Sequence, residues 1–400
     1  MNARPILMIM LPALALWASG CTGAQRLDLA EQTGGSAALF GQFRAYDGRT
    51  GRPLTFAQVV RRCAAADVVL VGERHSDAVC NQIEAQLLAA LLAQRRPVAL
   101  AMEFFEADTQ ASVDAYLARR IDESAFYEQT RRSPSYVRSH RPLVELCRAA
   151  GVPVIAANAP RGLVRAYRVS GQPYSEFRAA LDPEQQRWLP PTCEDLGGAY
   201  RERFMEVMAS HVAPPAPATP EPSEPAASPA DAPSVEEMTT PAPTSAPSAE
   251  EPAAADESAA EGPAVAQPAV ERSEAASPAA FYRAQLLWDE AMADALAAFR
   301  ERFSAHRMML VVGAFHVAHE GGTTVKYRQR RPQDHVVTVV YVASEDGALA
   351  FDQADRGAGD ILVYGVTPPP SRRKAEPAGS SPGEAASGAS PGVAAEPVSE

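Results

Sequence analysis

The chain contains the stretch VVLVGERH at residues 68–75, in which an apolar run stops at a glycine and is followed by a glutamate, an arginine and a histidine. Three further apolar runs stop at a polar residue or a glycine: VALAM at 98–102, VPVIAA at 152–157 and MMLVV at 308–312. Short runs rich in valine, isoleucine and leucine with polar ends are typical of strands buried on both faces. The sequence therefore predicts a mostly parallel β-sheet.

Helical patterns separate these strands. Residues 77–94 repeat apolar side chains at helical spacing, and Ser76 or Asp77 is available as the N-cap. Further helices are predicted at 108–119, 143–150, 161–167 and 280–302, and a further strand, at an edge of the sheet, at 336–342. Strands that alternate with helices indicate an α/β fold, with helices flanking the sheet.

Two segments have a composition unlike the rest. Residues 213–278 consist mainly of Pro, Ala, Ser and Glu, with twelve acidic residues against the single Arg272, and residues 368–400 are similar in kind. Both are predicted to be disordered, because they cannot bury enough apolar surface. Since a long loop adds little closure entropy, residues 40–212 and 279–367 are predicted to form one core around the insertion.

The net charge of the chain is -12, and most of it lies in the acidic insertion. The remaining body is close to neutral, which gives no sign of nucleic-acid binding.

The N-terminal residues are predicted to be an export signal. Residues 1–20 combine an early arginine with a short apolar run and end in ASG before Cys21. This pattern predicts a bacterial lipoprotein with its lipid on Cys21 and a tether at 21–39, held at the outer membrane and facing the periplasm. The alternative is an ordinary secretory signal that is cleaved after Gly20.

Charged side chains follow the first two strands. Glu73 and His75 lie two residues apart, so on extended chain both point the same way, which suits metal coordination or general-base chemistry. The alternative is a turn with solvated polar residues. Glu103 stands in an otherwise apolar run, where a carboxylate is costly unless it is paired. It is either a functional group or half of a structural ion pair with an arginine.

The last strong strand ends in GAFH, which repeats the Gly-x-x-His arrangement and places His316 at its end. A lone histidine is usually structural, and His319 is interpreted as a loop residue. Ligands of open α/β sheets collect at the carboxyl ends of the strands. Glu73, His75, Glu103 and His316 are therefore predicted to share one site.

Further polar residues are weaker candidates for the same edge. Asn158 ends the third strand, and Arg161 lies near a helix start, where it would favour a carboxylate or phosphate on a ligand. The alternative is ordinary helix capping. His140 and Arg141 offer another ligand and another cation.

Together these motifs resemble the ChaN family, the haem-binding-uptake branch of the Tiki superfamily. The segments that carry the resemblance are VLVGERH (69–75), AMEFFE (101–106), RPL (141–143), NAPR (158–161), YRAQLLWDEAMA (282–293) and GAFH (313–316). They span both halves of the predicted core and neither low-complexity segment. Cys80 and Asn81 stand where the family often has paired histidines, and His140 stands where tyrosine is expected.

The resemblance implies an α/β fold and a haem-binding lipoprotein, and it allows a homodimer. Related branches are hydrolases, with a divalent metal in the Tiki proteases. Position by position, the resemblance carries the site over to Glu73, His75, Glu103 and His316.

Three functions stay open at this point. The first is a membrane-anchored lipoprotein that binds haem or an iron-bearing ligand for uptake, using side chains drawn from His75, His140, Arg141, Asn158, Arg161 and His316. The second is a metal-dependent hydrolase, with a divalent ion held by Glu73, His75 and His316, and with Glu73 and Glu103 as the catalytic carboxylates. The third is a binding scaffold without catalysis.

Overall fold

The computed structural model describes residues 41–212, 277–344 and 346–367. The predicted signal peptide, Cys21, the tether, nearly all of the acidic insertion and the C-terminal tail lie outside these residues. Among the described helices, none is both long enough and apolar enough to cross a membrane.

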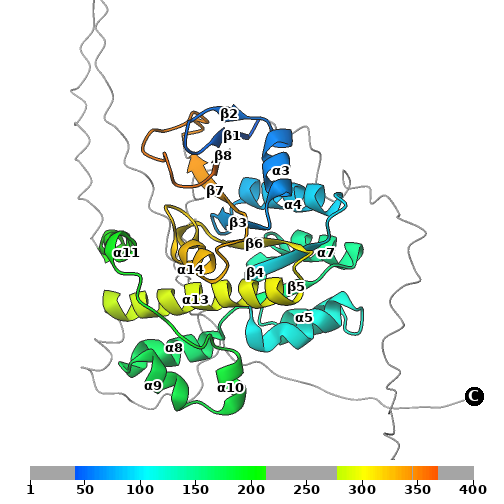
Figure 1. Ribbon diagram of the computed structural model, residues 1–400. Coiled ribbons are helices and arrows are strands. Elements are labelled where there is room, and N and C mark those ends of the chain that lie inside the picture. The colour runs from blue at the N-terminus through cyan, green and yellow to red at the C-terminus, as the bar shows by residue number, and fades with distance from the viewer. Residues whose placement is uncertain (1–40, 213–276, 345, 368–400) are drawn as a thin grey trace, which may run out of the picture. The chain divides into compact units, whose positions relative to one another are not determined.

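Within the described ranges, one eight-stranded sheet has the order β2-β1-β8-β7-β3-β6-β4-β5 (Figure 1). The strands are β1 (Phe43–Asp47), β2 (Pro53–Leu54), β3 (Val68–Glu73), β4 (Val98–Glu106), β5 (Val154–Asn158), β6 (Arg307–Gly313), β7 (Val336–Ser344) and β8 (Ile361–Val366). Neighbours from β8 to β5 pair in parallel, whereas β1 runs antiparallel to both β2 and β8.

The two halves of the chain share this sheet. β6, from the second half, lies between β3 and β4 of the first half, with Val68 opposite Met308 and Glu73 opposite Gly313. The predicted α/β class and mostly parallel sheet are confirmed.

The position predicted for the 336–342 strand is wrong. β7 lies inside the sheet, between β8 and β3, and not at an edge. The outer positions on that side belong to β8, β1 and β2, which were not predicted. β8 has the apolar sequence ILVYGV and could have been recognised as a buried strand, whereas β1 and β2 are too short to give a clear pattern.

Helices cover both faces of the sheet. They are α3 (Phe56–Ala65), α4 (Ala78–Leu92), α5 (Gln110–Leu117), α6 (Glu123–Gln129), α7 (Arg141–Ala150), α8 (Arg161–Ser170), α9 (Tyr174–Ala179), α10 (Pro183–Arg187), α11 (Gly198–Val212), α13 (Pro278–Arg302) and α14 (Gly322–Arg330), with 3-10 turns η1 (Ala107–Thr109), η2 (Pro134–Val137) and η3 (Ala314–His316). The helices predicted at 77–94, 143–150, 161–167 and 280–302 correspond to α4, α7, α8 and α13, and the one at 108–119 divides into η1 and α5.

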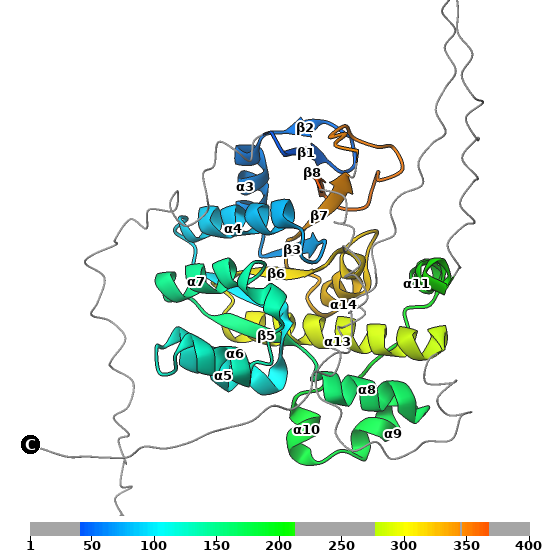
Figure 2. The ribbon, with the colours of Figure 1, turned by 180° about the vertical axis from the view of Figure 1, so that it is seen from behind.

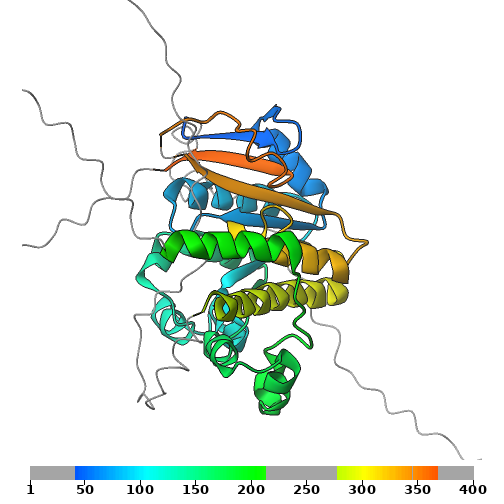
Figure 3. The same cartoon turned by 90° about the vertical axis from the view of Figure 1, so that its left-hand side faces the viewer.

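The sheet lies between two layers of helices, and this arrangement explains why the central strands have an uninterrupted apolar sequence. Val69 and Val71 pack towards the face covered by α3, α4, α5 and α7 (Figure 2). Val68 and Leu70 pack towards α13 and α14 on the other face. Figure 3 shows α11 running beside α13 on this second side. Because both faces of β3 are buried, every one of its side chains is apolar until the strand ends.

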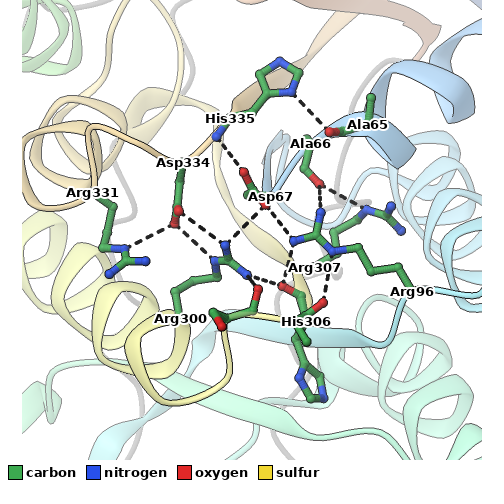
Figure 4. Close-up of polar contacts among 12 residues, drawn as sticks. Ala65, Ala66, Asp67, Arg96, Arg300, His306, Arg307, Arg331, Asp334 and His335 are labelled. Atoms are coloured by element: carbon green, nitrogen blue, oxygen red, sulfur yellow. Dashed lines mark hydrogen bonds and ion pairs between the residues drawn. The ribbon is translucent and has the colours of Figure 1, made fainter.

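A cluster of arginines and aspartates joins the amino ends of the strands (Figure 4). Arg300, at the end of α13, lies 3.1 Å from Asp334 and 3.3 Å from Asp67, and it also donates to the carbonyl oxygens of Ser304 and His306. Burial alone would raise the pKa of Asp334, but the hydrogen bond from Arg300 is the largest of several effects that lower it to about 2. Arg300 therefore links the ends of several elements through charge-assisted hydrogen bonds.

Replacing this arginine should destabilise the fold. Arg300 is 4% exposed, so Arg300→Ala removes a buried cation from Asp67 and Asp334 and a donor from two carbonyl groups. Asp67 then keeps Arg96, and Asp334 keeps Tyr327 and Arg331. Removing one member of a buried ion pair typically costs about 3 to 5 kcal/mol of unfolding free energy. Chemical denaturation measures the loss. Arg302→Ala is the matched control, because Arg302 lies in the same helical turn but is exposed; equal losses for the two variants would contradict the assigned role.

Candidate functional site

Side chains from three strand ends meet at the carboxyl edge of the sheet. The Oε2 atom of Glu103, in β4, accepts the backbone N–H of Gly313 at 2.8 Å, and its Oε1 lies 3.7 Å from Nε2 of His316. A Cβ atom placed on Gly313 would lie 3.1 Å from Nε2 of His75, so the His75 ring rests against this glycine. The structure thus places His75, Glu103 and His316 near one another at this edge, and their role in a shared ligand or catalytic site stays a prediction.

Glu73 is the buried centre of one part of this cluster. Its carboxylate lies 2.9 Å from Nδ1 of His75 and 2.9 Å from Nε2 of His140. Burial would raise the pKa of Glu73, but the charges and hydrogen bonds of His140 and His75 lower it to about 2. The structure thus presents a carboxylate held between two imidazoles.

Phe104 contacts both imidazole rings. His140 stacks on Phe104 with the ring centroids 3.6 Å apart, and His75 meets the same ring edge-on at 5.4 Å. The side chain of His75 is 33% exposed, against 8% for His140. His75 is therefore the accessible imidazole of the pair, and His140 is a buried partner of Glu73.

His316 belongs to a second, deeper part of the cluster. Its Nδ1 atom lies 2.7 Å from Oδ1 of Asp289, and the amide nitrogen of Gln285 is 3.1 Å from the same ring nitrogen. Burial would lower the pKa of His316, but the charges of Asp289 and Glu103 raise it above its usual value.

The sequence interpretation missed Asp289 and Gln285. Both project from α13, which was predicted as a helix without functional side chains, and Asp289 is fully buried. The available signal was polar residues, spaced four apart, in the otherwise apolar stretch AQLLWDEAMA. Tyr200 of α11 also donates to Asp289.

Three of the weaker candidates have local partners. Arg141 pairs with Glu123, and Arg161 donates its backbone N–H to Glu106 at 3.0 Å. The side chain of Asn158 accepts the backbone N–H of the following residue at 2.9 Å. For Asn158 and Arg161 these contacts are of the structural kind that was the alternative, and a ligand-binding role for Arg141, Asn158 or Arg161 stays a prediction.

Cys80 lies in the buried layer behind Glu73. Its thiol is 3.5 Å from Oε1 of Glu84, and burial raises the pKa of both groups. A neutral thiol is a poor metal ligand. More generally, the described part of the chain contains no group of three or more His, Cys, Asp or Glu residues arranged to hold a metal ion. The metal-ligand role of Glu73, His75 and His316 stays a prediction.

The family model for haem-binding uptake proteins of the Tiki superfamily, ChaN, matches residues 59–326. The chain belongs to this ChaN family. No curated protein matches the sequence.

Solved structures show a similar fold. A structure described as cofacial haem binding to ChaN of Campylobacter jejuni aligns with a TM-score of 0.50 at 14% identity, over 80% of this chain and 96% of that one. An erythromycin esterase in its open conformation aligns with a TM-score of 0.37 at 10% identity, over 82% of this chain and 83% of that one. A Bacillus cereus protein aligns with a TM-score of 0.36 at 9% identity, over 85% of this chain and 97% of that one. At such low identity, the likeness to the Campylobacter protein concerns the fold alone.

The packing around Asp289 predicts a sensitive glycine. A Cβ atom on Gly322 would lie 2.0 Å from Oδ2 of Asp289 and 2.8 Å from the hydroxyl of Tyr200. Gly322→Ala should therefore lower the unfolding free energy by about 1 to 3 kcal/mol, the usual cost of overpacking. Gly162→Ala is the control, because its new Cβ atom would meet nothing within 4 Å. Equal denaturation midpoints for the Gly322 variant and the wild type would show that Asp289 is less confined than the structure indicates.

Proposed function

We propose that the protein binds haem at the carboxyl edge of the sheet, with His75 as the iron ligand. The observation that carries the proposal is the hydrogen bond between Glu73 and Nδ1 of His75, on a ring that is one-third exposed. Histidines that ligate metals commonly hold a carboxylate with their other ring nitrogen, which fixes the ring and strengthens it as a donor. The donor set of this chain therefore fits haem iron.

The neighbouring residues support this assignment. Phe104 places a flat aromatic ring beside His75, suited to packing against a porphyrin. His140 takes the other side of the Glu73 carboxylate and so holds it in place. The match to the ChaN family and the haem bound by the Campylobacter ChaN support the same ligand.

The cellular setting is part of the proposal. The sequence ASGC before residue 22 supports lipid attachment at Cys21 and anchoring at the outer membrane, facing the periplasm. In that setting a haem-binding protein would serve iron or haem uptake. A homodimer around haem is compatible with the family.

Haem titration tests the ligand. Purified protein mixed with ferric haem should show a shifted Soret band that saturates, and His75→Ala should lose the shift and bind roughly tenfold or more weakly, because the iron loses its axial ligand. His335→Ala is the control, since His335 is exposed and lies at the opposite end of the strands. No spectral change with the wild type, or equal loss in both variants, would refute haem ligation by His75.

A specific observation favours a second function, acid–base hydrolysis. Glu103, His316 and Asp289 form a buried row in which carboxylates lie on both sides of an imidazole. This row of two carboxylates and an imidazole can accept a proton and return it during the attack of water on an ester or amide. A divalent metal, if one binds, would add a polarised water.

A screen of ester and peptide substrates, with metal analysis of the purified protein, tests this function. Glu103→Gln keeps the shape of the side chain but removes its charge, so it should reduce hydrolysis by roughly 100-fold or more. Glu123→Gln is the control, because Glu123 is a half-exposed carboxylate that pairs with Arg141. Hydrolysis that survives Glu103→Gln would exclude this carboxylate as the base. Absence of both haem binding and hydrolysis would leave the scaffold alternative.

A further inference from the structure

Asp289 lies at the meeting point of several elements. Its Oδ1 atom accepts hydrogen bonds from Nδ1 of His316 at 2.7 Å and from the hydroxyl of Thr323 at 2.8 Å, while Oδ2 accepts one from Tyr200. These donors come from η3, α14 and α11, whereas Asp289 itself belongs to α13. A fully buried carboxylate with three donors is held in one position.

The start of α14 contributes a further constraint. A Cβ atom on Gly322, the first residue of α14, would clash with Oδ2 of Asp289 at 2.0 Å, so the carboxylate lies directly against the first turn of this helix. The positive end of a helix dipole favours an anion there. Replacing Gly322 by any other residue would push the carboxylate away, which explains a glycine inside the first helical turn.

The contact has a consequence for the imidazole. A carboxylate at 2.7 Å can only accept, so Nδ1 of His316 must be the donor and carry a proton. The other ring nitrogen, Nε2, then faces Glu103, whose Oε1 lies 3.7 Å away. The amide nitrogen of Gln285 lies 3.1 Å from Nδ1 and 3.4 Å from Nε2. With a proton on Nδ1, that amide can donate only to Nε2.

We propose that Asp289 is a positioning residue that fixes the proton of His316 on Nδ1 and thereby directs Nε2 towards Glu103. A role of Asp289 in catalysis rests on the second proposed function, hydrolysis. The effect of Asp289 on the His316 tautomer does not depend on that function, because the tautomer is a property of the protein without substrate or haem. A carboxylate that orients a histidine in this way holds the basic nitrogen ready for proton transfer.

Nitrogen NMR of the full chain, labelled with ¹⁵N-histidine, tests the proposal directly. Protonated and bare imidazole nitrogens give well-separated signals, and the His316 signals are identified as those lost in His316→Gln. At alkaline pH, Nδ1 of His316 should carry a proton in the wild type. In Asp289→Asn the amide can donate to Nδ1, so the Nδ1 signal should shift towards the position of a bare nitrogen.

A control variant and the wild-type spectrum together make the test decisive. Asp294→Asn alters a half-exposed aspartate of the same helix, which pairs with Arg330, and it should leave the His316 signals in place. Should Asp289→Asn fail to fold, the wild-type spectrum still decides. A bare Nδ1 in the wild type, or identical His316 signals in the wild type and a folded Asp289→Asn, would overturn the proposal. Neither result depends on whether haem binds or a substrate is found.

Discussion

The whole arrangement depends on the pairing of β6 with β3 and β4. This pairing sets Gly313 beside Glu73 and brings the segment that begins at Ala314 next to Glu103. Parallel strands end at the same edge, so side chains that follow them in sequence meet in space. A slip of this register by one residue would turn each apolar side chain of β6 to the opposite face. The core and the polar cluster are thus fixed by the same hydrogen-bonded ladder.

The cluster itself is a compromise between burial and charge. Glu73, Glu103, Asp289 and His316 are all nearly inaccessible, and isolated charges in such surroundings are unfavourable. The structure offsets this cost by alternating carboxylates with imidazoles and by supplying backbone and hydroxyl donors. Structural stability alone would be met equally well by apolar residues. The retention of so many ionisable groups at one edge therefore argues for chemistry or ligand binding there.

Strands with a continuous apolar pattern were predictable, and so were the polar residues directly after them. Local sequence is sufficient in these cases, because the strand and the group that ends it are adjacent in the chain. Asp289 was missed for a different reason. The sequence shows a polar residue in a mostly apolar helix, but it does not show its partner, because His316 lies 27 residues away on another element. The interior position of β7 was also missed, because β8 was not recognised and β1 and β2, which extend the sheet beyond β8, are too short to give a clear pattern. Arg141 and Arg161 show the converse, since a cation near a predicted site can be engaged by a nearby carboxylate.

The insertion of β6 between two earlier strands also has a consequence for biogenesis. A nascent chain that has emerged as far as α11 contains β3 and β4 but not the strand that separates them in the finished sheet. Until residues 307–313 arrive, both strands expose an unsatisfied ladder of amide and carbonyl groups, a surface prone to intermolecular pairing. Contacts so distant along the chain also form slowly. We therefore expect the nascent chain to need chaperones until β6, and after it β7 and β8, have been synthesised and can join the sheet.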